Sequence, residues 1–537
     1  MTQVCLTLTP QQAADGQSIQ KAVARELRLP FEAIYAYRIQ KRSVDARQRQ
    51  IKVLLTVQAF LSADEAQLPP YEQPLYRDVH EAQRQVLIVG AGPAGLFAAL
   101  TLLQKGIRPV IIERGKPVSE RKVDIACLNK NEGIRPESNY CFGEGGAGTF
   151  SDGKLFSRSK KRGNMQRVME LFHYHGAADS VLYEAHAHIG SDRLPAIIRS
   201  MREAILEHGG IIRFEEKFTG ISREADGAIR ILTDRGTYTG EAVILAIGHS
   251  AHDTYRLLAQ SGISLQPKGF ALGVRAEHPQ WLIDDLMYHS SPLRKQGLLP
   301  AASYSLVTQV HNEFGQRGAY SFCMCPGGHI VPAGSTAHSG VVNGMSASHR
   351  NSPFANSGMV VELHPEDMVS YDTLQTGDLL STEAALECLE WQEKVEETSW
   401  QHGAVAAGQP ESAIAPGQRL KDFVEGRESK DLPKTSYLPG CIPSRLDQWL
   451  PPVVSKALRQ GFRDFDRKYP GFLTNEAVIL GVESRSSSPV RIPRDPETLQ
   501  HPAFPGLYPA GEGAGYAGGI TSSALDGINA ALRIAGE

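Results

Sequence analysis

The chain has 537 residues, enough for two or three domains that each bury a sizeable core. Its 56 basic and 59 acidic side chains nearly cancel, which argues against nucleic acid or a membrane surface as a partner. No apolar run approaches the roughly 18 residues of a transmembrane helix. The first ten residues lack the regions of a signal peptide, and the seven cysteines are few and scattered, so we expect reduced thiols and a cytoplasmic location.

The first 60 residues predict a small α+β module. Their patterns indicate a strand at 4–8, a helix at 18–27 and strands at 33–39 and 50–57. Residues 61–84 are rich in proline and charge, and they predict a linker. A basic cluster surrounds the predicted turn of the module; it suits a solvated hairpin face better than an RNA- or phosphate-binding patch. The cluster consists of Arg38, Lys41, Arg42, Arg47 and Arg49.

Residues 85–115 have the order of a βαβ dinucleotide-binding unit. A strand at 86–89 is followed by the pattern G-x-G-x-x-G, a helix and a second strand at 109–112. The glycines allow a tight turn and a close approach of the backbone to a pyrophosphate, which the helix N-terminus would hold. Glu113 would accept hydrogen bonds from a ribose. The residues expected at the dinucleotide are Gly90, Gly92, Pro93, Ala94, Gly95, Glu113 and Arg114.

A glycine-rich loop at 141–158 is expected to run past the same ligand. Its backbone N–H groups and one lysine would bind there, from Gly146, Ala147, Gly148, Thr149 and Lys154. The histidine pairs at 173/175 and 186/188 lack the accompanying ligands of a zinc site, so we expect no metal.

Residues 263–470 break the βαβ pattern and predict an inserted α+β domain with one clear helix near 382–397. Cys323 and Cys325 lie in it. On a straight strand their Cα atoms would be about 6.6–6.8 Å apart, at the upper edge of the disulfide range of about 4.4–6.8 Å. A bridge would therefore need a kinked strand. Two packed small side chains are the favoured interpretation, and a redox or substrate-contacting thiol pair or a metal site are the alternatives.

The closing segment decides which dinucleotide is bound. A strand at 507–510 ends in a Gly-Glu pair, and two glycines precede a last helix. Flavoproteins use such a segment for the ribityl or phosphate part of FAD, and the helix directs its positive end at the flavin. The strand at 242–247 and the glycine after it fit a segment that crosses beneath FAD. The residues expected at FAD here are Ala246, Gly248, Gly511, Glu512, Gly518, Gly519 and Ile520.

The motifs GAGPAGLFAAL, GGAGTFSDGKL, AIGHSAHDTY, FCMCPGG, NGMSASHR, ESRSSSPVRI and GLYPAGEGAGYAGG together resemble a family of uncharacterised bacterial FAD-dependent dehydrogenases, with succinate dehydrogenase-like relatives. The resemblance covers nearly the whole chain. It implies an α/β fold with a Rossmann-like, glutathione reductase-type FAD-binding domain, which we place at 85–262 and 471–537, and an inserted cap at 263–470. The histidine that links flavin in succinate dehydrogenase-like enzymes is absent from GEGGAGTF, so we expect non-covalent FAD. Cys141 stands alone where glutathione reductase-like enzymes place a C-x-x-x-x-C pair, which excludes that chemistry at this position.

The leading hypothesis is an FAD-dependent oxidoreductase that passes a hydride between an unidentified small molecule and flavin N5. Its candidate catalytic residues are Arg275, Cys323, Cys325 and Arg485; Arg485 and Arg491 could bind an anionic substrate or stabilise reduced flavin. No second G-x-G-x-x-G with a strand and a helix is visible, so NAD(P)H would be only a transient electron donor. The alternatives are an RNA-directed flavoenzyme related to tRNA modification and a flavin redox sensor with Cys323 and Cys325 as its output. The sequence gives no indication of the oligomeric state.

Overall fold

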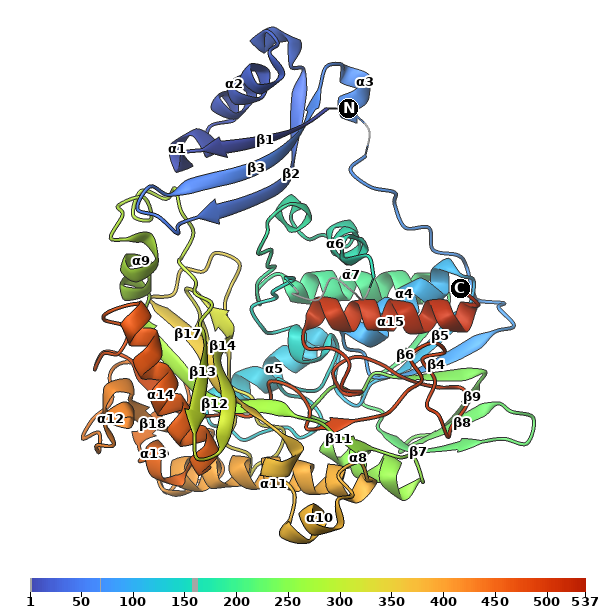
Figure 1. Ribbon diagram of the computed structural model, residues 1–537. Coiled ribbons are helices and arrows are strands. Elements are labelled where there is room, and N and C mark those ends of the chain that lie inside the picture. Colours follow the sequence, from blue (N-terminus) through green and yellow to red (C-terminus); the bar gives the residue numbers. More distant parts are fainter. Residues whose placement is uncertain (1, 68, 157–162) are drawn as a thin grey trace.

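The computed structural model describes residues 2–67, 69–156 and 163–537 (Figure 1). Two sheets organise the main body, a parallel five-stranded sheet of order β22-β10-β4-β5-β6 and a seven-stranded sheet of order β13-β14-β17-β12-β20-β18-β19. The first is formed by β4 (Gln85–Val89), β5 (Arg108–Ile112), β6 (Ile211–Arg213), β10 (Ala242–Leu245) and β22 (Leu507–Pro509). The second is formed by β12 (Phe270–Pro279), β13 (Val307–Asn312), β14 (Gly315–Cys325), β17 (Phe354–Leu363), β18 (Ala415–Arg419), β19 (Cys441–Pro443) and β20 (Val478–Glu483).

The parallel sheet is covered on both faces, as its continuous apolar strands require. Alternate residues of each strand point to opposite faces, so Ile88 and Ile244 join one core while Leu87 and Val243 join another. The first core is closed by α4 (Pro93–Gln104), α6 (Met165–Tyr174), α7 (Leu194–Glu207) and α15 (Ile520–Ala535). The second is closed by α8 (His252–Gln260) and by a small sheet of β7 (Phe218–Arg223), β8 (Ile229–Thr233) and β9 (Thr237–Gly240).

The seven-stranded sheet is built mainly from the segment expected to form the cap, and one of its strands comes from beyond the expected boundary. We placed residues 471–537 in the FAD-binding domain, but β20 pairs with β12 and β18 in the large sheet. The expected boundary near residue 471 is therefore wrong for β20. The sequence did not reveal this, because the apolar residues of β20 could be buried in either sheet. The chain returns to the parallel sheet through β21 (Val490–Arg491), which pairs with β11 (Gln266–Pro267).

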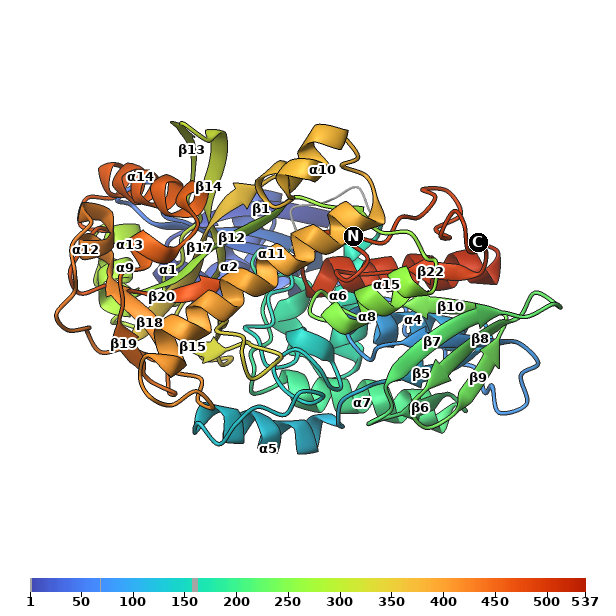
Figure 2. The ribbon, with the colours of Figure 1, turned by 90° about the horizontal axis from the view of Figure 1, so that it is seen from below.

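Helices cover the cap sheet and connect it to the FAD-type domain. α14 (Pro452–Lys468) packs on β12, β13, β14 and β17, and α11 (Thr382–Trp400) extends from β18 and β20 to α8 (Figure 2). The remaining elements are α5 (Val118–Asn129), α9 (Gln280–Tyr288), β15 (His329–Pro332), β16 (Val342–Met345), α10 (Tyr371–Thr376), α12 (Leu420–Glu425) and α13 (Leu446–Trp449). In the part of the chain that the structure describes, no helix is long and apolar enough to cross a membrane.

The N-terminal module is a three-stranded antiparallel sheet with its own core (Figure 1). It contains β1 (Thr2–Leu8), α1 (Pro10–Ala13), α2 (Gly16–Leu27), β2 (Ala36–Asp45) and β3 (Lys52–Phe60), and the expected linker holds a short helix, α3 (Ala63–Gln67). The N–H of Arg42 donates to the carbonyl of Tyr183 at 2.8 Å, and Ile51 packs in the core of the cap. Within the basic cluster, Arg42 forms an ion pair with Glu184, and Arg47 forms one with Asp45. These two arginines are therefore neutralised by carboxylates of the protein.

Candidate functional site

A cavity of about 810 Å³ lies at the carboxyl ends of β4, β5, β10 and β22. This is the edge at which open parallel sheets bind ligands, and the volume lies within the range of about 300–1,000 Å³ usual for ligand sites. The FAD motifs form one wall. The opposite wall comes from the cap and the segment after β20, through Lys268, Tyr320, Ser321, Phe322, Cys323, Asn343, Arg485, Ser486 and Arg491.

Glycine backbone shapes the part of the cavity expected to hold the pyrophosphate. Gly90 has a φ of +105°, and a Cβ there would lie 2.4 Å from the carbonyl oxygen of Ala246, so only glycine fits. A Cβ on Gly92 would meet only the Cα of Gly146, at 3.8 Å, which leaves the backbone open to a ligand. Gly95 lies outside the cavity lining, and a Cβ there would lie 2.0 Å from Gly90 O. Gly95 was expected at the dinucleotide, but it instead allows the helix to pack closely on the strand.

Two helices begin at the cavity without a side-chain cap. Gly92 precedes α4 and Gly519 precedes α15, and neither N-terminus has a side-chain cap hydrogen bond. Uncapped N–H groups and the helix dipole favour negative charge at these two places. They suit the pyrophosphate and the electron-accepting edge of the flavin, so the cavity fits FAD.

Glu113 lines the cavity and also holds its rim together. One carboxylate oxygen accepts from the N–H of Ala91 at 2.8 Å, and the other accepts from Gly115 at 2.8 Å and Gly143 at 3.0 Å. The sequence predicted only its ribose contact. Arg114 next to it also lines the cavity, but its guanidinium donates to both oxygens of Asp253 at 2.9 Å. We infer that Arg114 fixes the wall more than it binds the ligand.

The glycine-rich loop lies against the start of α4, with one exception to the expectation. Gly146, Ala147, Gly148 and Lys154 line the cavity. Thr149 does not: its N–H donates to Gly146 O and its hydroxyl to Glu144 O, so both groups are used within the turn. The prediction for Thr149 is therefore wrong. Residues 157 and 158 of this loop lie outside the described residues.

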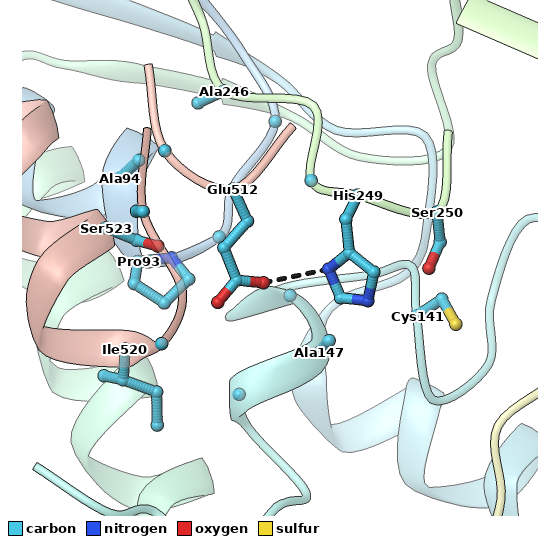
Figure 3. A pocket seen from close by; sticks show the side chains of 18 of the residues that line it. Pro93, Ala94, Cys141, Ala147, Ala246, His249, Ser250, Glu512, Ile520 and Ser523 are labelled. Atoms are coloured by element: carbon cyan, nitrogen blue, oxygen red, sulfur yellow. Dashed lines mark hydrogen bonds and ion pairs between the residues drawn. The ribbon is translucent and has the colours of Figure 1, made fainter. Parts of the chain in front are cut away.

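His249 and Glu512 form a pair across the cavity (Figure 3). Nδ1 of His249 lies 2.8 Å from Oε2 of Glu512, and Figure 3 shows the ring directed from the segment after β10 toward the closing segment. The same cavity is lined by Ala246, Gly248, Gly511, Gly518, Gly519 and Ile520. His249 was not identified from the sequence, although it lies in the motif AIGHSAHDTY. Its position just after the end of a predicted strand could have indicated a residue of the site.

The two cysteines do not lie on a straight strand. The register of β14 against β17 shifts between Phe322 and Cys325, and Cys323 has a φ of +47°. The thiol of Cys325 donates to the carbonyl oxygen of Cys323 at 3.4 Å. Nζ of Lys154 lies 3.5 Å from Cys323 Sγ and 3.4 Å from Cys325 Sγ. Cys323 lines the cavity and Cys325 is buried behind it, so Cys325 is packed as the favoured interpretation expects, whereas Cys323 also faces the cavity.

Arg275 lies behind the cavity wall. It is fully buried and donates to Asn356 Oδ1 at 2.9 Å, Glu483 Oε2 at 3.1 Å and Cys325 Sγ at 3.3 Å. Burial raises the pKa of Glu483 to about 7, although Arg275 opposes this rise. Arg275 therefore does not reach a substrate in the cavity. It contacts the cysteine pair from the side that faces away from the cavity.

Arg485 reaches the cavity but is neutralised by a buried carboxylate. Its guanidinium donates to both oxygens of Glu396, at 3.0 and 2.8 Å, and to Ser335 Oγ at 2.8 Å. Two other cations that line the cavity, Lys268 and Arg491, are better placed to bind an anion. Lys268 was not identified from the sequence. Burial lowers the pKa of Lys268 to about 8, and the Nε of Arg491 has no hydrogen-bond partner among the described residues.

The histidine pairs have structural partners. His173 contacts Tyr71 and Asp179, His175 contacts Tyr76 and Ser200, and His188 contacts Ser348. Over residues 2–67, 69–156 and 163–537, no group of three or more His, Cys, Asp or Glu side chains could hold a metal ion.

Comparison with known families identifies FAD-type segments in the chain. Residues 83–125 match a family described as an FAD binding domain, and residues 269–486 match one described as FAD-dependent protein, C-terminal domain-like. Residues 1–60 match a domain of unknown function. The FAD-binding match contains the βαβ unit, so FAD is the cofactor.

A relative and several solved structures resemble the chain. It is 37% identical to an uncharacterised protein of Clostridium beijerinckii over 539 residues, which cover 97% of this chain and 96% of the relative. CtdE in complex with FAD is 12% identical over 84% of each chain, with a TM-score of 0.31. A thioredoxin reductase from Gloeobacter violaceus is 18% identical over 32% of this chain and 38% of its own, with a TM-score of 0.18. These TM-scores are too low to carry an argument about this chain.

Proposed function

Because the chain belongs to a family of FAD-dependent proteins, we propose that it is an oxidoreductase that passes a hydride between a small-molecule substrate and flavin N5. One observation supports this most directly: the cavity has FAD motifs on one wall and polar cap residues on the other. A substrate between them would face both the flavin and the cap. FAD, when bound, supplies the two-electron chemistry.

The residues of the chain would hold FAD without a covalent bond. The start of α4 and the backbone around Gly92 would bind the pyrophosphate, and Glu113 would accept from the ribose. The start of α15, with Gly519 before it, would face the flavin. Glycines at these positions let the backbone approach the ligand.

His249 is the group best placed to hold or move a proton. Glu512 engages Nδ1 of the ring, which fixes its orientation and leaves Nε2 for a substrate or a water molecule. Lys268 and Arg491 would favour a substrate with negative charge, because both cations line the cavity. The buried ion pair between Arg485 and Glu396 would stabilise the cap wall of the cavity.

An anaerobic screen tests the proposal. The purified yellow protein is mixed with NADH, NADPH or members of a metabolite panel, and the oxidised-flavin absorption band is followed. At least one compound should bleach the band, and the oxidised compound should appear in equal amount. If dithionite bleaches the bound flavin but no member of the panel does, the proposed reaction is contradicted.

A further inference from the structure

The Cys323–Cys325 pair has a geometry that the rest of the site does not explain. The sheet expected to hold the two residues apart is interrupted at Cys323, whose φ of +47° is unusual for a residue with a side chain. Beside the interruption, both thiols contact one ammonium group, since Lys154 Nζ lies 3.5 Å from Cys323 Sγ and 3.4 Å from Cys325 Sγ. A kinked strand is what a bridge between residues two apart requires, because a straight strand holds them at the upper edge of the disulfide range.

The charges around the pair favour a thiolate. Lys154 contacts both sulfurs, and Arg275 lies 3.3 Å from Cys325 Sγ and donates to the carbonyl of Cys323 at 2.8 Å. The hydrogen bond with Cys325, then Lys154 and Arg275, hold the pKa of the Cys323 thiol well below its usual value. The same hydrogen bond, with burial, raises the pKa of the Cys325 thiol.

The pair is also asymmetric in access. Cys323 lines the cavity that holds FAD, whereas Cys325 is fully buried behind it. A thiolate at the cavity with a second thiol behind it is the arrangement in which one sulfur reacts with a partner and the other closes a disulfide. Two structural thiols would need neither the cations nor the access.

We propose that Cys323 and Cys325 form a reversible disulfide that exchanges two electrons with FAD; this rests on the proposed flavoenzyme function. In the oxidising direction both sulfurs give up their protons and a bond forms between them. Two electrons and one proton pass to FAD, and the second proton passes to water. In the other direction, reduced FAD and one proton from water cleave the sulfur–sulfur bond and restore both thiols.

An anaerobic dithionite titration of the oxidised holoprotein tests this exchange. The wild type should consume two two-electron equivalents per FAD, one for the flavin and one for the disulfide. The Cys323→Ser/Cys325→Ser variant should consume one. The Cys127→Ser variant, whose thiol lies on α5 outside the cavity lining, should consume two like the wild type.

Peptide mapping of the wild type gives a second readout that needs no variant. After mild oxidation, the peptide with both cysteines should lack two hydrogens, and it should regain them when FAD is photoreduced before denaturation. Free thiols at both positions after oxidation, or one equivalent per FAD in the wild type, would overturn the proposal. Neither readout uses a substrate, so the hydride-transfer reaction can fail or succeed independently.

Discussion

Glu512 Oε2 lies 2.8 Å from Nδ1 of His249, although the two residues are 263 positions apart in the chain. The pair joins the segment after β10 to the segment after β22, two neighbouring strands of the parallel sheet. The carboxyl ends of parallel strands meet at one edge, so both side chains reach the same cavity (Figure 3). This contact fixes the orientation of the His249 ring in the cavity. The sequence predicted only Glu512 of this pair, as a residue that binds FAD.

FAD should be released by acid. Backbone groups, helix ends and Glu113 would hold it without a covalent bond, and residues 143–148 contain no histidine. After acid precipitation, all yellow colour should be in the supernatant, and chromatography should identify it as FAD. Colour that stays with the precipitated protein would show a covalent bond.

Gly92→Ala should weaken FAD binding without preventing folding. The new Cβ would meet only Gly146 Cα, at 3.8 Å, so the protein can accommodate it, but it would cover the backbone that approaches the pyrophosphate. We expect an affinity loss of at least about tenfold, or about 1.4 kcal/mol, in a fluorescence titration of the apoprotein. Gly236→Ala is the control, because it lies in an exposed turn with only Tyr238 at 4.0 Å. Equal affinities in the two variants would exclude Gly92 from the FAD site.

Glu113→Ala should affect both the cofactor and the apoprotein. A hydrogen bond to a charged group contributes about 1.5–3 kcal/mol, so FAD affinity should fall by at least tenfold. The three N–H groups that Glu113 accepts would also lose their partner, which should lower the melting temperature of the apoprotein. Glu120→Ala, an exposed change on α5, should alter neither quantity. An unchanged Kd for FAD would mean that Glu113 serves the protein backbone alone.

Cys323 should react with iodoacetamide at a lower pH than an ordinary thiol. The hydrogen bond with Cys325 and the charges of Lys154 and Arg275 lower the pKa of the Cys323 thiol, whereas burial and Asp152 oppose this, so its thiolate forms at a lower pH than that of an ordinary thiol. Lys154→Met removes one favourable charge, which should raise the midpoint of the pH profile by about 1–3 units. The profile of Cys127 serves as the internal control. The same Cys323 midpoint in both proteins would contradict the role of Lys154.

Local patterns predicted the βαβ unit, the closing segment and the helix α11, because each depends on residues close together in the chain. The kink at Cys323 could not be predicted, since it follows from the register of β14 on β17. The membership of β20 in the cap sheet was missed because VILGVE is apolar enough to be buried in either sheet. Likewise, the pairing of Arg485 with Glu396 joins residues 89 positions apart, which no local spacing reveals.

The structure of the FAD-loaded protein tests the central claim most directly. The account predicts that the pyrophosphate lies at the start of α4, and that the isoalloxazine ring lies near Lys154 and His249 and contacts the cap wall at Cys323. An isoalloxazine ring that contacts no cap residue, or an adenine at the cap wall in its place, would contradict the account.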